Sequence, residues 1–345
     1  MTIKEIAGLA GVSTATVSYV INGTRNVSDE TKERVLKVIE KSGFRPNSIA
    51  KSLRAQNTRT IGVVVEDIRG FPVPSIVNGI SEYTERHNYQ ILLNDLHMLE
   101  SLLNRYDQIT YLKDRINNVI SWLLYGARVN AIIYVGMFDR DITNVLNRIN
   151  NPLVVAYSLT SDDWNRCVTY DNENISAELT RYLIGMGHRR VGVITGLAHT
   201  LPSKMRMRGL LRAFSEAGLV LDSSYVQNGD WDYQSGYDCM MDFLKMENRP
   251  TAVIAMNDIM AAGAMNAVLD RGLTVPGDVS IVGFDNRGMS SYLRPRLTTV
   301  NIDLEKLGLK ATETAIEMIN KTNSGEHTYT LPCEIIFRDS VRSLL

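Results

Sequence analysis

The chain has 345 residues, of which 44% are hydrophobic and 22% charged, a composition typical of a globular protein with two or three domains. The three cysteines form no CxxC pair, which argues against a metal or cofactor site. The first residues lack the basic and then apolar run of a signal peptide, and no apolar stretch is long enough to span a membrane. We therefore expect a cytoplasmic protein that contacts no membrane. The net charge of −1 conceals a basic start, because residues 1–60 carry ten Lys or Arg against five Asp or Glu, which favours a polyanion as the partner of this segment.

The first residues predict two short helices joined by a tight turn. Apolar residues recur at helical spacing over residues 3–10, and Gly11 allows the turn that follows. Ser13 is placed to cap a second helix, which Gly23 ends. This arrangement is a helix-turn-helix, the motif that places its second helix in the major groove of DNA.

The second helix has one apolar face and one small, polar face. Val17, Val20 and Ile21 form the predicted inner face, whereas Thr14, Ala15, Ser18 and Tyr19 point outward. An ordinary solvated helix carries Glu and Lys on such a face, while short hydroxyls and methyl groups suit base edges. The alternative is a small helical bundle without a partner.

A third helix is predicted from Ser28 to Gly43, and a short segment follows it. Pro46 breaks the chain, and Asn47 can cap a helix that runs to Arg54 but is too short to be stable alone. Leu53 has no evident core to join, and an apolar side chain beside DNA can wedge into the minor groove. The alternative is a plain linker.

The remaining 285 residues alternate short apolar runs with segments of helical length. Alternation of this kind predicts parallel sheets that are covered by helices on both faces. We expect an α/β fold with two Rossmann-like lobes and a ligand crevice at the carboxyl ends of the strands. The predicted strands are residues 61–65, 90–93, 131–135, 153–156, 191–195, 252–256 and 280–284, and the predicted helices include residues 174–186 and 204–217.

Polar and aromatic residues stand where these strands end. An acid, a guanidinium, an amide and an indole that converge on a crevice suit a polyol, because the charged groups bond its hydroxyls and the ring covers an apolar face. Each residue also has an ordinary structural interpretation, such as a turn cap, a surface ion pair or a core side chain. The residues concerned are Asp171, Arg206, Trp231, Asn257 and Asp285.

The amino-terminal motifs together resemble the lac repressor family of sugar-responsive regulators. They are Thr2-Ile-Lys-Glu-Ile-Ala, Gly11-Val12-Ser13, Thr16-Val17-Ser18, Asn22-Gly23, Pro46-Asn47, Ala50 and Leu53, in this order. The resemblance implies that Thr14, Ala15 and Tyr19 read bases, that Thr16, Asn22 and Arg25 contact the DNA backbone, and that Leu53 and Arg54 enter the minor groove. The body resembles the periplasmic sugar-binding fold, whose lobes are joined by three crossings.

The resemblance also implies a division of the chain and an effector site. We expect a helix-turn-helix domain over residues 1–46, a hinge over 47–59 and an effector and dimerisation domain over 60–345. The first lobe is expected to hold about 60–159 plus 292–322 and the second about 160–291 plus 323–345, with crossings near residues 158–160, 289–293 and 321–324. The implied effector residues are Phe71, Val73, Asp171, Arg206, Trp231, Asn257 and Asp285.

Three features depart from the family pattern in the first lobe. Pro72 and Pro74 alter the loop after the first strand, and Tyr157 stands where the family usually has an acid. The stretch 95–130 is longer than expected, and its apolar residues at helical spacing predict core or dimer surface. They are Leu96, Leu99, Leu102, Leu103, Tyr106 and Ile109.

These observations predict a homodimeric repressor that binds a palindromic DNA operator and responds to a small molecule, with a sugar favoured. A protein corepressor or a non-sugar ligand remains the alternative effector. A sugar-binding transport component is a second alternative, against which the missing signal peptide and the basic start argue. We expect no enzyme, because the phosphate-loop, GxSxG, HExxH and strand-placed GxGxxG motifs are absent from the sequence.

Overall fold

The computed structural model describes residues 1–22, 25–43, 58–102, 109–322 and 325–345. The chain forms two compact units, Met1–Thr58 and Arg59–Leu345. Most of the predicted hinge, including Leu53 and Arg54, lies outside the described residues. None of the helices in these ranges is long and apolar enough to cross a membrane.

The first unit contains the three predicted helices, α1 (Ile3–Ala10), α2 (Thr14–Asn22) and α3 (Asp29–Ser42). Gly11 ends α1 with a φ of 63°, a left-handed conformation that glycine adopts without strain. The Ser13 hydroxyl accepts a hydrogen bond from the Thr16 amide at 3.0 Å and so caps α2. All three helices contact one another. Their shared core consists of Ile6, Ala7, Ala10, Val17 and Val35.

The second unit contains two six-stranded sheets, as expected for two Rossmann-like lobes. Every neighbouring strand pair is parallel except β12 with β10, which is antiparallel. In spatial order, the first sheet is β11 (Thr328–Leu331), β5 (Arg166–Tyr170), β4 (Leu153–Ala156), β3 (Ala131–Val135), β1 (Thr60–Val65) and β2 (Gln90–Asp95). The second is β12 (Glu334–Ile336), β10 (Thr298–Asn301), β9 (Ser280–Asp285), β8 (Ala252–Ala255), β6 (Val191–Thr195) and β7 (Val226–Asn228).

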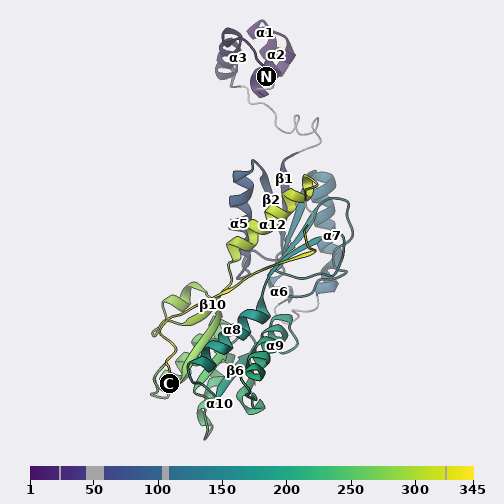
Figure 1. Cartoon of the computed structure of the whole chain (residues 1–345). Helices are drawn as coiled ribbons and strands as arrows, with labels where there is room; N and C mark the ends of the chain where they lie inside the picture. Colours follow the sequence, from purple (N-terminus) through teal and green to yellow (C-terminus); the bar gives the residue numbers. More distant parts are fainter. Residues whose placement is uncertain (23–24, 44–57, 103–108, 323–324) are drawn as a thin grey trace. The chain divides into compact units, whose positions relative to one another are not determined.

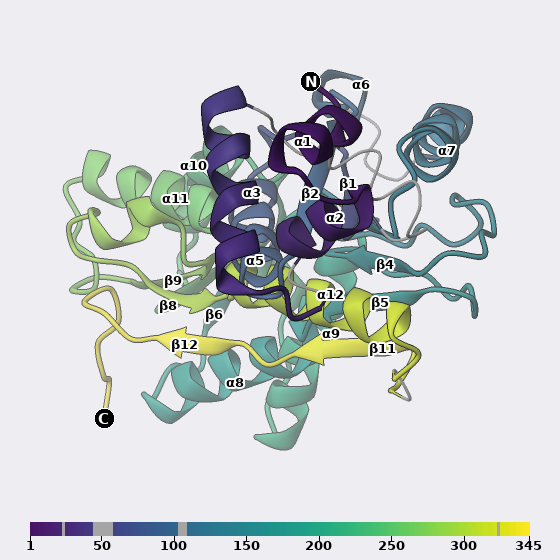
Figure 2. The same cartoon turned by 90° about the horizontal axis from the view of Figure 1, so that it is seen from above.

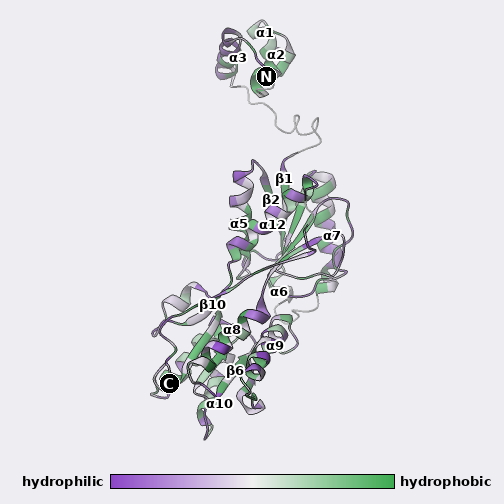
Figure 3. Cartoon of the chain, viewed as in Figure 1, coloured by the Kyte–Doolittle hydropathy of each residue, from purple (hydrophilic) through white to green (hydrophobic). Residues whose placement is uncertain are grey.

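Helices cover both sheets (Figure 1), and the strands are mainly hydrophobic (Figure 3). On the first sheet, α5 (Val73–Arg86) packs beside α12 (Leu304–Ile319), and α7 (Lys113–Ser121) contacts β1. On the second, α10 (Tyr233–Lys245) packs beside α11 (Asp258–Asp270), and α8 (Asn172–Gly185) beside α9 (Leu201–Glu216). We call each sheet with its helices a lobe.

The chain crosses between the lobes at three places that differ from the predicted ones. The first crossing follows β5 near Asp171, the second joins β10 to α12, and the third joins β11 to β12. Figure 2 shows this last crossing as one continuous yellow run. The predicted crossings near residues 158–160, 289–293 and 321–324 are therefore wrong.

The predicted lobe boundaries fail for the same reason. β5 pairs with β4 and belongs to the first lobe, β10 pairs with β9 and belongs to the second, and β11 pairs with β5 in the first. These strands have only four or five residues. Which sheet a short strand joins depends on hydrogen bonds to strands distant in sequence, so local pattern could not assign it.

The stretch 95–130 does not form the continuous helical stripe that its apolar spacing suggested. Its described residues form the short helix α6 (Leu99–Leu102), a 3-10 turn (Ile109–Leu112), α7 and a π-helical turn (Trp122–Gly126). Leu96 and Ile109 are buried in the core of the first lobe. This part of the stretch therefore contributes core, one of the two predicted roles.

We expect Gly79→Ala to lower the thermal stability of the second unit. Gly79 lies where α5 meets α12, and a Cβ there would overlap the backbone carbonyl of Glu305. Backbone cannot yield as a flexible side chain does, so we expect a cost of about 1–3 kcal/mol. Gly185→Ala is the control, because a Cβ at this helical glycine has nothing within 4 Å and should stabilise by about 0.5–1 kcal/mol. Equal melting temperatures of the two variants would contradict this account of the α5–α12 contact.

Candidate functional site

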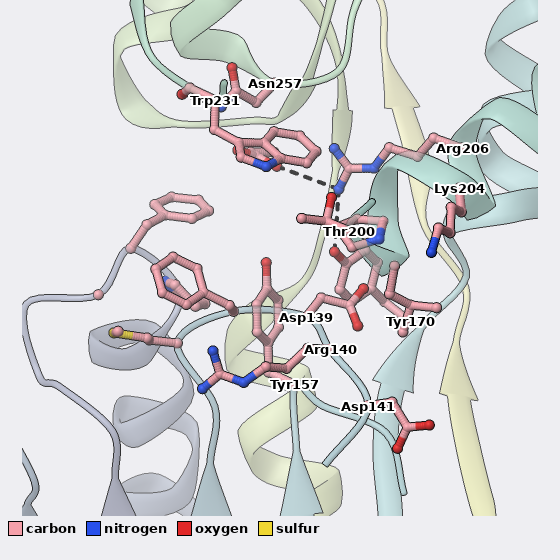
Figure 4. A pocket seen from close by; sticks show the side chains of 18 of the residues that line it. Asp139, Arg140, Asp141, Tyr157, Tyr170, Thr200, Lys204, Arg206, Trp231 and Asn257 are labelled. Carbon is pink, nitrogen blue, oxygen red and sulfur yellow. Dashed lines mark hydrogen bonds and ion pairs between the residues drawn. The ribbon is translucent and has the colours of Figure 1, made fainter. Parts of the chain in front are cut away.

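The second unit contains a cavity of about 470 Å³ at the carboxyl ends of the strands of both sheets. Figure 4 shows side chains of both lobes facing one another across it, with Trp231 and Asn257 on one side and Tyr157 and Arg140 on the other. This is the position at which parallel α/β sheets bind ligands. Its lining includes Phe71, Phe138, Asp139, Arg140, Tyr157, Tyr170, Thr200, Lys204, Arg206, Trp231, Asn257, Asp285 and Arg287.

Arg206 is held in the cavity wall by several hydrogen bonds. It lies on α9, is 3% exposed, and donates from Nε to Asn172 Oδ1 at 2.8 Å and from an Nη atom to the Met256 carbonyl. Its other Nη atom donates to the Tyr170 hydroxyl at 3.3 Å and lies 3.9 Å from the Asp285 carboxylate. These bonds fix the guanidinium in one orientation, so it can offer a planar set of donors to a ligand.

Two acids follow strands of the second lobe: Asp285 lines the cavity, whereas Asp258 is completely buried and does not line it. Asp285 ends β9 with a φ of 107°, and burial raises its pKa while Arg206 and Arg287 oppose that effect. Asp258 begins α11, where it accepts hydrogen bonds from the Arg287 amide at 2.7 Å and the Thr299 hydroxyl at 2.5 Å. Burial, and then the charge of Asp285, raises the pKa of Asp258 to about 7.

Aromatic rings of both lobes border the same cavity. Trp231 of the second lobe lies against Gly196, where a Cβ would overlap the indole ring, and its carbonyl accepts a hydrogen bond from the Asn257 amide at 2.9 Å. Phe71 of the first lobe lies under the Arg287 guanidinium, 3.7 Å from the ring centroid to Cζ. The rings therefore offer apolar faces beside the charged groups, as binding of a sugar or a planar base requires.

The structure brings five of the seven predicted effector residues together in this cavity. They are Phe71, Arg206, Trp231, Asn257 and Asp285. Val73 does not join them, because it begins α5 and is completely buried in the core of the first lobe. Asp171 does not join them either, because its carboxylate caps α8 by accepting from the Asn174 amide at 2.9 Å.

Sequence reasoning missed the polar residues that the first lobe contributes. Asp139 follows β3, and Tyr157 follows β4 and stacks on Tyr170 with 5.4 Å between ring centroids. Arg140 is buried and forms an ion pair with Glu66 at 2.5 Å. Asp139 follows a buried parallel strand as Asp285 does, so its position after the strand is the sequence signal for it.

The three residues predicted to read bases lie on α2. Thr14 and Ala15 are exposed on α2, and Tyr19 is half-buried. Arg25 is exposed, with its guanidinium 5.1 Å from the centroid of the Tyr19 ring. Thr16 is half-buried beside Ser13, with 2.9 Å between their hydroxyl oxygens. The side chain of Asn22 lies outside the described residues.

We expect the stability of the second unit to fall as the pH rises from about 4 to 7 through the Asp258 carboxyl. The pKa of this group is near 3.8 in the unfolded chain and about 7 in the folded unit, so the folded state binds the extra proton. The stabilisation is complete below the lower pKa and is lost as the pH rises through the higher one. Differential scanning calorimetry of wild type and Asp258→Asn checks this, and parallel pH profiles for the two proteins would contradict it.

Two family models match the chain. One, described as bacterial regulatory proteins of the lacI family, matches residues 2–47. The other, described as a periplasmic binding protein-like domain, matches residues 180–341. The first match covers α1 to α3, and the second begins within α8 and extends beyond β12.

Curated relatives match along the whole chain. The HTH-type transcriptional repressor PurR of Pasteurella multocida is 32% identical over 100% of this chain and 99% of its own length. Catabolite control protein A of Priestia megaterium is 33% identical over 99% of both chains. Neither relative is an enzyme by its name, in agreement with the prediction from the sequence.

Solved structures of the same architecture also match along the whole chain. The lac repressor dimer bound to operator and the anti-inducer ONPF superposes with a TM-score of 0.80 at 23% identity, covering 99% of both chains. The complex of the transcriptional regulator CelR with cellobiose superposes with a TM-score of 0.67 at 26% identity, also over 99% of both chains. The predicted two-lobed α/β fold behind a helix-turn-helix is thereby confirmed.

Proposed function

Because the chain belongs to the lac repressor family of DNA-binding transcriptional regulators, we propose that it is a repressor whose affinity for an operator is set by a small molecule held between its two lobes. The observation that carries the proposal is the cavity lined from both lobes in a chain that also carries a helix-turn-helix. A ligand can shift such a protein between two states only if it binds them with different affinity.

At the DNA end, we assign base reading to Thr14, Ala15 and Tyr19. Thr14 and Ala15 are exposed on one face of α2, where a hydroxyl and a methyl group can meet base edges. Backbone contacts are assigned to Thr16, Asn22 and Arg25, and minor-groove contacts to Leu53 and Arg54. The basic balance of residues 1–60 supports this arrangement.

Dimerisation belongs to the same proposal. One helix-turn-helix reaches only a half-site, so a two-fold dimer is the simplest way to read a palindrome with useful affinity. Each protomer would then contribute one copy of α2 and its own ligand cavity.

At the ligand end, we assign effector binding to Phe71, Arg206, Trp231, Asn257 and Asp285. Arg206 and Asp285 offer donors and acceptors, and the two rings offer apolar faces, as a sugar requires. The CelR relative in complex with cellobiose supports a sugar. A planar nucleobase is the second candidate, because aromatic residues also line the first-lobe side and Tyr157 stands in place of an acid there.

Selection from a pool of randomised DNA duplexes tests the DNA half of the proposal. We expect palindromes to be enriched, and the affinity for them to fall steeply with salt because phosphate contacts release counterions. Tyr19→Ala should weaken the preference for the selected palindrome about tenfold or more, whereas Tyr125→Ala, at an exposed tyrosine of the second unit, should not. Equal affinity of the wild type for random and selected DNA would contradict the proposal that the protein recognises a specific operator.

A further inference from the structure

Resting on the proposed function, we propose that Asp139 selects the effector: one oxygen of its carboxylate takes a hydrogen-bond donor of an uncharged ligand, a sugar hydroxyl or a nucleobase N–H. Asp139 follows β3 in the first lobe and is 6% exposed. It lines the cavity beside Tyr157 and Tyr170 (Figure 4).

The two oxygens of this carboxylate have different surroundings. Oδ2 accepts a hydrogen bond from the Asn172 amide at 2.7 Å. Oδ1 is fully buried and has no partner at hydrogen-bond geometry among the described residues, while the nearby Tyr170 hydroxyl lowers the pKa of the carboxyl. A buried acceptor without a donor is costly and uncommon in folded proteins, so the vacant oxygen indicates that a ligand atom completes the site.

Among the described residues, no Lys or Arg side chain donates a hydrogen bond to Asp139, although the charge of Arg206 favours its ionised form. Arg206 donates hydrogen bonds to Asn172, the Met256 carbonyl and Tyr170. Arg140, the next residue in sequence, instead forms its ion pair with Glu66. Burial raises the pKa of Asp139, whereas the hydrogen bond from Asn172 and the charge of Arg206 lower it. The ionised carboxylate repels a phosphate or carboxylate group, so the proposal requires an uncharged ligand at this position.

The neighbouring hydroxyls do not change that requirement. Burial raises the pKa of both Tyr157 and Tyr170, and the charge of Asp139 adds to the effect in each case. Both phenols are therefore neutral at physiological pH. They leave Asp139 and Asp141 as the carboxylates on the first-lobe side of the cavity, of which Asp139 is buried and Asp141 exposed.

The contact also joins the two lobes. Asn172 is the first residue of α8 in the second lobe, and its side chain lies between Asp139 of the first lobe and Arg206 of the second. A donor bound to Asp139 therefore acts on a chain of hydrogen bonds that ends at Arg206. Asp139 can thus recognise the ligand and transmit its presence at the same place.

The test measures thermal shifts and titration calorimetry of the full chain with named probes. D-glucose, cellobiose and hypoxanthine are the uncharged probes, and D-glucose 6-phosphate is the anionic one. We expect at least one uncharged probe to raise the melting temperature when it is present at less than about 10 mM. Comparing the two sugars with hypoxanthine shows whether the hydrogen-bond donor is a sugar hydroxyl or a nucleobase N–H. Binding of the phosphate alone, or of no uncharged probe, would overturn the inference.

Variants then test the residue. Asp139→Asn should weaken binding of the successful probe about tenfold or more, because its amide presents donors where the ligand needs an acceptor. Asp163→Asn is the matched control, an exposed acid of the same lobe, and should bind within about twofold of wild type. Unchanged binding by Asp139→Asn would overturn the inference.

A final comparison separates recognition from a merely structural effect. Monodeoxy sugars or N-methyl bases related to the successful probe each lack one hydrogen-bond donor. The analogue that lacks the donor to Asp139 should bind the wild type about tenfold more weakly than the parent probe does. The Asp139→Leu variant should bind that analogue and the parent probe equally well. Additive losses would contradict direct contact. Asp139→Asn should still bind the selected palindrome as wild type does. If the wild type binds no palindrome, the proposed function is refuted, but the result on ligand binding by Asp139 still holds.

Discussion

Replacing Val17 with Asp is expected to abolish operator binding while the second unit stays folded and keeps its ligand response. Val17 lies within α2, is 0% exposed and packs with Ile6, Ala7 and Val35 in the core of the first unit. An unpaired carboxylate at this position costs several kcal/mol, about as much as the whole stability of so small a unit. Loss of the folded first unit removes α2 from the DNA, and with it the reading face.

Fluorescence anisotropy with the selected palindrome measures this effect, and the thermal shift of the second unit serves as the internal control. Leu36→Asp is the matched variant, because it adds the same charge to the same unit at a residue that is 46% exposed. We expect Leu36→Asp to bind DNA within about tenfold of wild type, since surface changes seldom cost much stability. Equal binding by the two variants would show that the α1–α3 core does not support DNA recognition.

Arg206→Ala is expected to eliminate the ligand response and to destabilise the second unit. The guanidinium donates to Asn172, the Met256 carbonyl and Tyr170, and it faces Asp285 at 3.9 Å. Its removal leaves Asp285 with Arg287 at 3.3 Å and takes a donor from three buried acceptors, at a cost of about 1–3 kcal/mol for each acceptor left unsatisfied. Loss of two hydrogen bonds from a charged group to a ligand lowers affinity by about 100-fold or more.

Two further variants make this result interpretable. Arg206→Lys keeps the charge without the planar fork, so stability should recover more than affinity. Arg208→Ala lies two residues further along α9 at a guanidinium that is 63% exposed, and it should resemble wild type in both measurements. If Arg206→Ala retained the thermal shift produced by cellobiose or hypoxanthine, the assignment of the cavity as the effector site would be wrong.

Much of the candidate site followed from one rule applied to the sequence. Asn257 and Asp285 were predicted because each comes directly after a buried strand, and the structure places both in the cavity. Asp139 obeys the same rule but follows a loop of several residues after β3. Its vacant oxygen is a property of the surrounding fold, so no sequence pattern could have revealed it.

Two predicted effector residues show that the position of a residue in the sequence does not by itself tell which way its side chain points. Val73 is two residues beyond Phe71, yet it points into the core because α5 begins there and turns its side chain away from the cavity. Asp171 is next to Asn172, yet its carboxylate caps α8 while Asn172 bonds to Asp139. A shift of one or two residues at the start of a helix changes which way a side chain points, and boundaries of elements are the least certain part of a sequence-based prediction.

The sequence by itself determined the helix-turn-helix, the α/β class of the second unit and the presence of polar residues at strand ends. These features depend on contacts between residues close in the chain, such as the left-handed Gly11, the Ser13 cap and buried apolar runs. Only the tertiary structure decided that β5 and β11 join the first lobe and β10 the second, because hydrogen bonds between distant strands fix that membership. Only the tertiary structure brought Asp139, Asn172 and Arg206 together. The three residues come from three separate segments, and their spacing in sequence does not indicate that they are neighbours.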